Sequence, residues 1–308
     1  MSSNLGSLVT QYTTILDEVI EAEAKTADLT ANQNLVGEFV GAGIIKVAKI
    51  VMDGLGDYSR ASGFVEGDID LSWETMQLTH DRGRSFSIDI MDDEERLRIV
   101  TMNLMTQFVR TKVVPEVDAT RFATLAANAG NVVSAAISTS ADATNAVLAA
   151  EEIIEDTGVP LSECFLYCTS AFKGLLRKAQ EYRLMPGDTP NTLFEQFDDM
   201  RLIPVPQNRF YTAIDLYDGT TSSPTDETGG GYVKHVSTGG SDPAGKALNF
   251  MIVHPEACAA ITKHETLRYF APEVNQAKDA HLWQYRVYHD MLVYENKAGL
   301  IYAHAALS

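Results

Sequence analysis

The sequence contains only three cysteines, Cys164, Cys168 and Cys258, in 308 residues. An odd and sparse set of this kind excludes a disulfide framework and is typical of a reducing compartment. Cys164 and Cys168 flank a strand-like FLY run, and no second pair of ligands lies nearby. We therefore interpret them as buried thiols and not as half of a metal site.

Basic residues are also scarce. The chain has 24 Lys and Arg against 42 Asp and Glu, which gives a formal net charge of -18. Because phosphate binding depends on Lys and Arg, this balance disfavours tight binding to nucleic acid, and it equally disfavours an anionic membrane surface. We therefore expect no membrane partner and no sequence-specific contact with DNA.

Long apolar runs are missing as well. No stretch approaches the roughly 20 apolar residues needed to span a bilayer. The N-terminal MSSNLGSLVTQYTT lacks the basic and apolar regions of a signal peptide. The hydrophobic content of 45% nevertheless provides for a substantial core, in one large domain or two modest ones.

Catalytic motifs are the last notable absence. The sequence has no HExxH or GxSxG motif, and its seven histidines are scattered. The GGGYV run at 229–233 lacks the ending of a phosphate-binding loop, and Asp68 and Asp70 suit a solvated strand face better than a cation site. We expect no catalytic, cofactor-binding or metal-binding residue. A cytosolic enzyme with a dispersed site is the alternative from another class.

An alternation of apolar and polar residues stands out from 68 to 90. Period two on both sides of the HDRGR stretch predicts a β-hairpin that turns at Gly83. A lone two-stranded ribbon is marginal in water, and an exposed apolar face marks a binding surface, so we expect another copy of the chain to cover it. The candidate inter-subunit contacts are Ile69, Leu71, Trp73, Arg82, Arg84, Phe86 and Ile88.

A capped helix is predicted directly after this stretch. Asp92 suits the N-cap and Glu95 the capping box, and an apolar stripe runs through to Phe108. These features predict a helix over about 93–112, which we expect Pro115 to end. A second short helix is predicted in PEVDATRFATLAANA.

The other predicted elements mix helices and strands without a strict βαβ rhythm, so the predicted fold class is α+β. Helices are predicted at 8–20, 143–157, 171–180 and 255–264. Strands are predicted at 48–53, 162–170, 200–206 (an edge strand) and 248–255, followed by two C-terminal strands that join near 296–299. The stretch 218–246 is rich in Gly, Ser, Thr and Asp and is expected to form mobile surface loops.

Over residues 45–308 the chain resembles the major capsid proteins of tailed bacteriophages and prophages of Gram-positive hosts. The similarity is carried by GDYSRASGFVEGDIDLSWETMQLTHDRGRSFSIDIMDDEE, FVRTKVVPEVDATRFATLA, NFMIVHPEA and WQYRVYHDMLVYENKAGLIYA. The resemblance implies a Hong-Kong-97-like capsid fold. Its expected parts are an N-terminal arm (1–45), an E-loop β-hairpin (46–91), a spine helix with a peripheral domain (92–140), an axial domain (141–270, with flexible loops 218–246) and strands returning to the peripheral domain (271–308).

The resemblance also implies a structural, non-enzymatic function. The chain would self-assemble into hexamers and pentamers of an icosahedral virion capsid that encloses double-stranded DNA, and assembly would take place in the bacterial host cytoplasm. A separate scaffolding protein and a portal protein are expected partners, and a decoration protein is a further candidate. An encapsulin-type nanocompartment shell protein is the alternative with the same fold. The sequence has no lysine between Lys49 and Lys112, which predicts a shell without lysine–asparagine cross-links.

Overall fold

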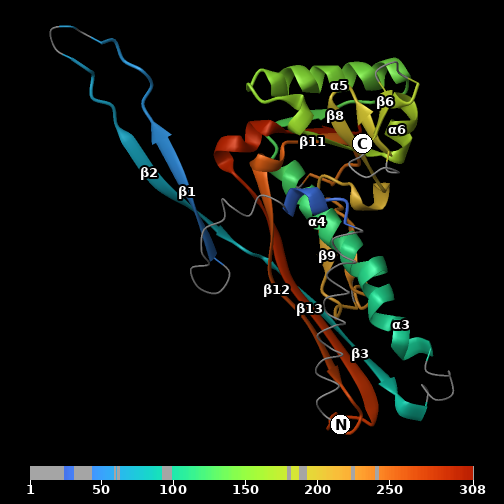
Figure 1. Ribbon diagram of the computed structural model, residues 1–308. Coiled ribbons are helices and arrows are strands. Elements are labelled where there is room, and N and C mark those ends of the chain that lie inside the picture. Colours follow the sequence, from blue (N-terminus) through green and yellow to red (C-terminus); the bar gives the residue numbers. More distant parts are fainter. Residues whose placement is uncertain are drawn as a thin grey trace.

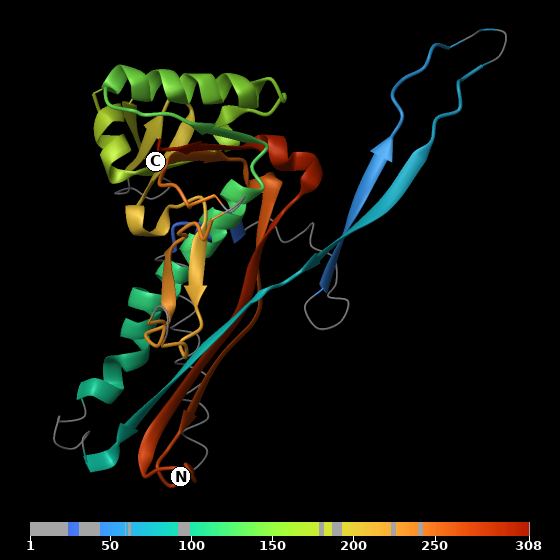
Figure 2. The same cartoon turned by 180° about the vertical axis from the view of Figure 1, so that it is seen from behind.

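The computed structural model describes residues 24–30, 44–58, 60, 63–91, 99–178, 182–186, 193–222, 226–239 and 243–307. Two larger sheets, a small hairpin and the helices packed on them form the body, and a two-stranded ribbon projects away from it (Figures 1 and 2). The predicted helix at 8–20 and the predicted N-cap at Asp92 lie outside the described residues.

A seven-stranded mixed sheet forms one end of the body. Its strands, in spatial order, are β4 (Asn131–Ser134), β14 (Ile301–Ala305), β11 (Leu248–Val253), β5 (Phe165–Thr169), β8 (Met200–Val205), β7 (Leu193–Phe197) and β6 (Tyr182–Pro186). Helices α5 (Ser140–Glu155) and α6 (Ser170–Leu176) cover one face of this sheet. The central strands β5 and β11 are buried almost throughout, as expected for strands covered on both faces.

A three-stranded antiparallel sheet forms the long axis of the body. It consists of β12 (Cys258–Phe270), β13 (Ala280–Val293) and β3 (His80–Asp89). Helix α3 (Ile99–Phe108), a π-helical turn (Val109–Val113) and α4 (Val114–Ala127) lie along it. Val117 of α4 packs against this sheet, while Phe122 packs in the core of the seven-stranded sheet. Helix α4 therefore joins the two cores.

Pro115 does not end the long helix, contrary to the sequence prediction. The backbone passes from α3 through the π turn into α4, where Pro115 occupies the first turn. The first turn of a helix tolerates proline because its missing N–H would lack a partner there, and the wide π turn has already interrupted the regular hydrogen-bond ladder. The two predicted helices are therefore one continuous rod.

The projecting ribbon differs in its strands from the predicted hairpin. Strand β1 (Ile44–Met52) pairs with β2 (Ile69–Gln77), whereas β3 pairs with β13. The turn predicted at Gly83 is wrong, because Gly83 lies inside β3 opposite Arg286. A Cβ atom at this position would lie 2.9 Å from the carbonyl oxygen of Tyr285. Glycine therefore allows β3 and β13 to lie close together here.

Two predictions in the C-terminal half are also wrong. Only Pro255–Ala257 form a helical turn where a helix was predicted at 255–264, and the chain then continues as β12. The long ladder between β12 and β13 outweighs the helix preference of the local alanines. Strand β8 is not an edge strand, because β5 and β7 flank it. Its Pro204 lies beyond the two residues that pair with β7.

Other predictions are confirmed, with small shifts of boundary. They include strands β1, β5 and β11, helices α5 and α6, and the two C-terminal strands β13 and β14, which a short helical turn (Glu295–Leu300) connects. These last two strands belong to different sheets. The segment 218–246 contains strand β10 (Gly231–Lys234), which forms a hairpin with β9 (Ile214–Tyr217).

Candidate assembly interface

The β1–β2 ribbon exposes large apolar side chains, and it joins the body only at its base. Near that base, Ile45 and Leu78 are buried with residues of β12 and β13. Farther out, Ile69 is 67% exposed and Trp73 is 58% exposed. The exposed apolar side chains of the ribbon are Ile44, Met52, Leu55, Tyr58, Phe64, Val65, Ile69, Leu71 and Trp73. A two-stranded ribbon of this kind is at best marginally stable in water, and its exposed apolar face marks it as a candidate binding surface.

The tip of the ribbon, residues 53–68, combines carboxylates with aromatic groups. The carboxylate of Asp53 accepts a hydrogen bond from the backbone N–H of Asp68 at 2.8 Å and closes the loop. The rings of Tyr58 and Phe64 lie 4.9 Å apart. Asp57 and Glu66 are also exposed. The tip is therefore an anionic surface with an aromatic patch.

The root of the ribbon is anchored to β13 by a carboxylate. Thr79, between β2 and β3, donates to Asp290 from its backbone N–H at 2.9 Å and from its hydroxyl at 2.8 Å. His80 lies 3.3 Å from the other oxygen. Burial alone would raise the pKa of Asp290, but these hydrogen bonds outweigh it and lower the pKa to about 2. The ionised side chain of Asp290 thus holds the base of the ribbon against β13.

The seven candidate contact residues lie on two different parts of the molecule. Ile69, Leu71 and Trp73 lie on the ribbon, while the others, Arg82, Arg84, Phe86 and Ile88, lie on β3 in the body. Phe86 packs at 4.9 Å against Phe108 of α3, so it belongs to a core within the chain. Ile88 is half-buried.

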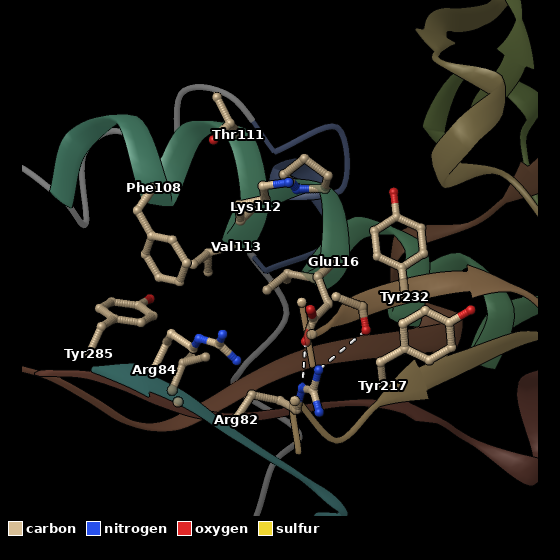
Figure 3. A pocket seen from close by; sticks show the side chains of 18 of the residues that line it. Arg82, Arg84, Phe108, Thr111, Lys112, Val113, Glu116, Tyr217, Tyr232 and Tyr285 are labelled. Atoms are coloured by element: carbon tan, nitrogen blue, oxygen red, sulfur yellow. Dashed lines mark hydrogen bonds and ion pairs between the residues drawn. The ribbon is translucent and has the colours of Figure 1, made fainter. Parts of the chain in front are cut away.

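Arg82 and Arg84 line a cavity of about 650 Å³ between the α3–α4 rod, the three-stranded sheet and the β9–β10 hairpin (Figure 3). The guanidinium of Arg82 donates to the carboxylate of Glu116 at 2.6 Å. Arg84 donates to the carbonyl oxygen of Thr228 at 3.0 Å, in the hairpin loop. The Arg84 contact, together with a longer one of 3.4 Å from Arg82 to the carbonyl oxygen of Gly231, holds the hairpin beside β3. We call this cavity the basic groove, because four basic and two acidic side chains line it.

A buried polar junction anchors the segment 24–30. Asp118 of α4 is fully buried and accepts hydrogen bonds from the Thr26 hydroxyl at 2.8 Å and from Arg209 at 3.0 Å. Arg121 donates to the same threonine hydroxyl at 2.9 Å, and its burial lowers its pKa. Sequence reasoning missed this junction, although Asp118 and Arg121 lie three residues apart in α4 and could have indicated an ion pair on one face of the helix.

The described residues offer little for chemistry or for a membrane. Within them, no three His, Cys, Asp or Glu side chains are grouped to hold a metal ion, and no helix is both long and apolar enough to cross a bilayer. Cys164 and Cys168 are buried, as predicted, and so is Cys258. Burial raises the pKa of Cys164 to about 11 and that of Cys258 to about 12, so these thiols stay protonated.

Comparison with known proteins gives matches at the level of structure. No protein-family model matches the sequence, and no curated protein matches it. The capsid structure of the cyanophage P-SCSP1u is similar with a TM-score of 0.59 and 8% identity, over 88% of this chain and 86% of that one. A structure from Mycobacterium phage Che8 gives a TM-score of 0.56 and 14% identity, over 85% and 84% of the two chains.

A virus-like particle from Pyrococcus furiosus is similar as well, with a TM-score of 0.51 and 9% identity over 94% of this chain and 96% of that one. At such low identity, likeness of structure establishes the fold. The chain has the α+β, Hong-Kong-97-like capsid fold, and the prediction from sequence is confirmed.

Proposed function

We propose that this chain is the major capsid (head) protein of a tailed bacteriophage, which self-assembles into hexamers and pentamers of an icosahedral shell enclosing double-stranded DNA. The observation that carries the proposal is the projecting ribbon on a capsid-type body, with Trp73 and its apolar neighbours uncovered. A neighbouring subunit in a shell supplies the missing cover. Each contact of this kind is modest, and closure of the shell makes many of them act together.

The elements have natural roles in such a shell. In this proposal the β1–β2 ribbon is the E-loop and the α3–α4 rod is the spine of a peripheral domain. The three-stranded sheet belongs to that peripheral domain, and the seven-stranded sheet forms the axial domain at the capsomer centre. Strand β14, near the C-terminus, then belongs to the axial domain, since it pairs with β4 and β11.

The proposal extends to partners and location. The protein acts as a structural component and not as an enzyme, assembles in the host cytoplasm and resides in the virion capsid. A scaffolding protein guides assembly, a portal protein occupies one vertex, and a decoration protein is a further candidate. An encapsulin-type shell has the same fold but carries protein cargo, so the nucleic-acid content of nuclease-treated particles distinguishes the two.

The test is a pair of substitutions on the ribbon. Leu71→Asp with Trp73→Asp places two charges on the exposed apolar face, so the variant is expected to give soluble monomers or capsomers and no closed shells. Electron microscopy and sedimentation of wild-type and variant particles measure the outcome. Val236→Asp, at a residue 66% exposed outside the ribbon, is the control. Normal shells from the double variant would refute the proposal.

A further inference from the structure

Within the part of the chain that the structure describes, the basic groove is lined by more cationic than anionic side chains. Arg84 points into it (Figure 3) and donates to one backbone carbonyl, but among the described residues it has no carboxylate partner. Lys112 and Lys234 also line the groove and are exposed. The aromatic rings of Phe108 and Tyr217 line the same groove. The groove therefore suits an anionic segment that also carries apolar or aromatic groups.

The ribbon tip is a segment of that chemistry. It carries the carboxylates of Asp53, Asp57, Glu66 and Asp68 against the single guanidinium of Arg60, together with exposed aromatic side chains. The ribbon leads away from the body in both views, so the tip does not reach the groove of its own chain (Figures 1 and 2). A segment that matches the groove but lies out of reach within one chain implies contact between chains.

We propose that the basic groove is the docking site for the ribbon tip of a second copy of this chain. The inference rests on the proposed function and specifies the surface beneath the ribbon. The carboxylates of Asp57 and Glu66 pair with Arg84 and Lys112, and the Tyr58–Phe64 patch packs on the aromatic wall of the groove. The β9–β10 hairpin forms one side of the site.

The glycines of the hairpin loop are part of this construction. Gly219, Gly230 and Gly231 all have positive φ angles, which other residues rarely adopt. A side chain at Gly219 would lie 2.7 Å from the guanidinium of Arg84, so glycine leaves the room that this cation occupies. The loop thus brings its backbone close to Arg84 without neutralising the charge.

Two other occupants are less suited to the groove. The net charge of -18 repels the phosphates of a nucleic acid, and the four cations of the groove are too few to offset this repulsion. An acidic peptide from a different protein would leave the ribbon tip uncovered. The ribbon tip of a second copy would neutralise the cations of the groove and would itself be covered. The experiments below distinguish it from both rivals.

The first experiment is a cysteine pair in the full chain, with Val65→Cys at the tip and Thr111→Cys in the groove. Assembled material, either capsomers or shells, is isolated by sedimentation and then oxidised with copper phenanthroline. A ladder of disulfide-linked multimers is expected on a non-reducing denaturing gel, with the 65–111 link identified by mass spectrometry. Each single-cysteine variant and the wild type, whose own cysteines are buried, should remain monomeric on the gel.

The second experiment reverses charges. Asp57→Lys with Glu66→Lys, and separately Arg84→Glu with Lys112→Glu, should each reduce the yield of assembled particles at least tenfold. The fourfold variant, in which the charges are exchanged, should recover most of that yield. Lys178→Glu with Lys278→Glu is the matched control, with the same change of charge at exposed positions elsewhere.

The outcomes separate this inference from the proposed function. Shells from the wild type without a 65–111 link, or tip reversal without effect while groove reversal abolishes assembly, would overturn the inference and leave the capsid function standing. The second pattern would assign the groove to another anionic partner. Failure of the wild type to form shells with its scaffolding partner would refute the function, while the cross-link between soluble copies would still decide the occupant of the groove.

Discussion

Asp118 is a fully buried carboxylate on which several polar contacts converge. It accepts hydrogen bonds from Lys25, Thr26 and Arg209, and Arg121 lies close by. Removing this carboxylate leaves two guanidinium groups in or near the interior without their counter-charge. Asp118→Ala is therefore expected to lower the free energy of unfolding by about 3–5 kcal/mol, as for other broken buried ion pairs.

Urea denaturation of the assembly-deficient Leu71→Asp/Trp73→Asp chain measures this effect without interference from shell formation. Asp199→Ala, at an exposed position, is the control and is expected to change stability by less than about 0.5 kcal/mol. If both variants lost the same stability, the junction at Asp118 would not stabilise the fold as described.

Lysine is absent from the ribbon tip, which bears on covalent cross-linking. A lysine–asparagine cross-link needs a neutral amine as the nucleophile, and arginine cannot replace it because it stays protonated. Lys46 and Lys49 do lie on the ribbon, since β1 begins at Ile44, so the expectation of a lysine-free E-loop fails for β1 and holds for the tip and for β2.

Mature particles are therefore expected to lack cross-links from the ribbon tip. Boiled particles should run on a denaturing gel as one band near 33.7 kDa. A ladder of multimers whose linked peptides include the ribbon would contradict the prediction. Mass spectrometry would then show whether Lys46 or Lys49 provides the amine.

At the scale of the element, β13 carries a buried histidine that makes stability depend on pH. Burial, together with repulsion from Arg121 and His80, lowers the pKa of His289 from 6.5 to about 3. Between these two values the unfolded chain binds a proton that the folded chain does not, so stability falls as the pH falls through this window. From about pH 7 to about pH 4.5 the loss from this residue is about 2–3 kcal/mol.

His289→Phe should flatten this part of the pH profile, since phenylalanine cannot take up the proton. Urea denaturation of the same assembly-deficient chain at several pH values between 4.5 and 7 measures the slope. His264→Asn, at an exposed histidine of β12, controls for the loss of one histidine. An unchanged slope in His289→Phe would show that other groups cause the acid sensitivity.

The elements also show what the sequence could and could not predict. Period-two alternation correctly located β2 and β3, because burial of alternate side chains is a local property. It could not identify their partners, and Gly83 was interpreted as a turn when the backbone of Tyr285 requires it inside a strand. The helix predicted at 255–264 failed for a related reason, since only the distant β13 makes β12 a strand.

The candidate site was less predictable than the fold. Ile69, Leu71 and Trp73 could be selected because the sequence shows apolar and polar residues alternating along a strand, with the apolar residues on one face. The basic groove draws its lining from β3, the α3–α4 rod, the β9–β10 hairpin and β13, which no local pattern connects. Arg84 and Lys112 line one groove only because the rod lies along the three-stranded sheet.

At the scale of the whole molecule, net charge bears on the contact with DNA that the proposed function implies. A net charge of -18 on each chain opposes the approach of phosphates, and the cations of the groove are few and partly paired. A shell that encloses DNA benefits from this repulsion, because packaged DNA must also leave it. Tight binding to DNA would need several free Lys or Arg side chains that release counterions together.

Soluble capsomers, or the Leu71→Asp/Trp73→Asp chain, are therefore expected to show no shift of linear double-stranded DNA in gel electrophoresis at about 0.15 M salt, up to protein concentrations of about 10 μM. That limit lies within the range of ordinary non-specific binding, with Kd of about 1–100 μM, so the absence of a shift is informative. Arg84→Glu with Lys112→Glu should behave identically, because in our assignment these cations bind protein carboxylates. A shift by the wild type that this variant lost would instead make the groove a phosphate-binding surface, and the shell would then hold its DNA through contacts on every subunit.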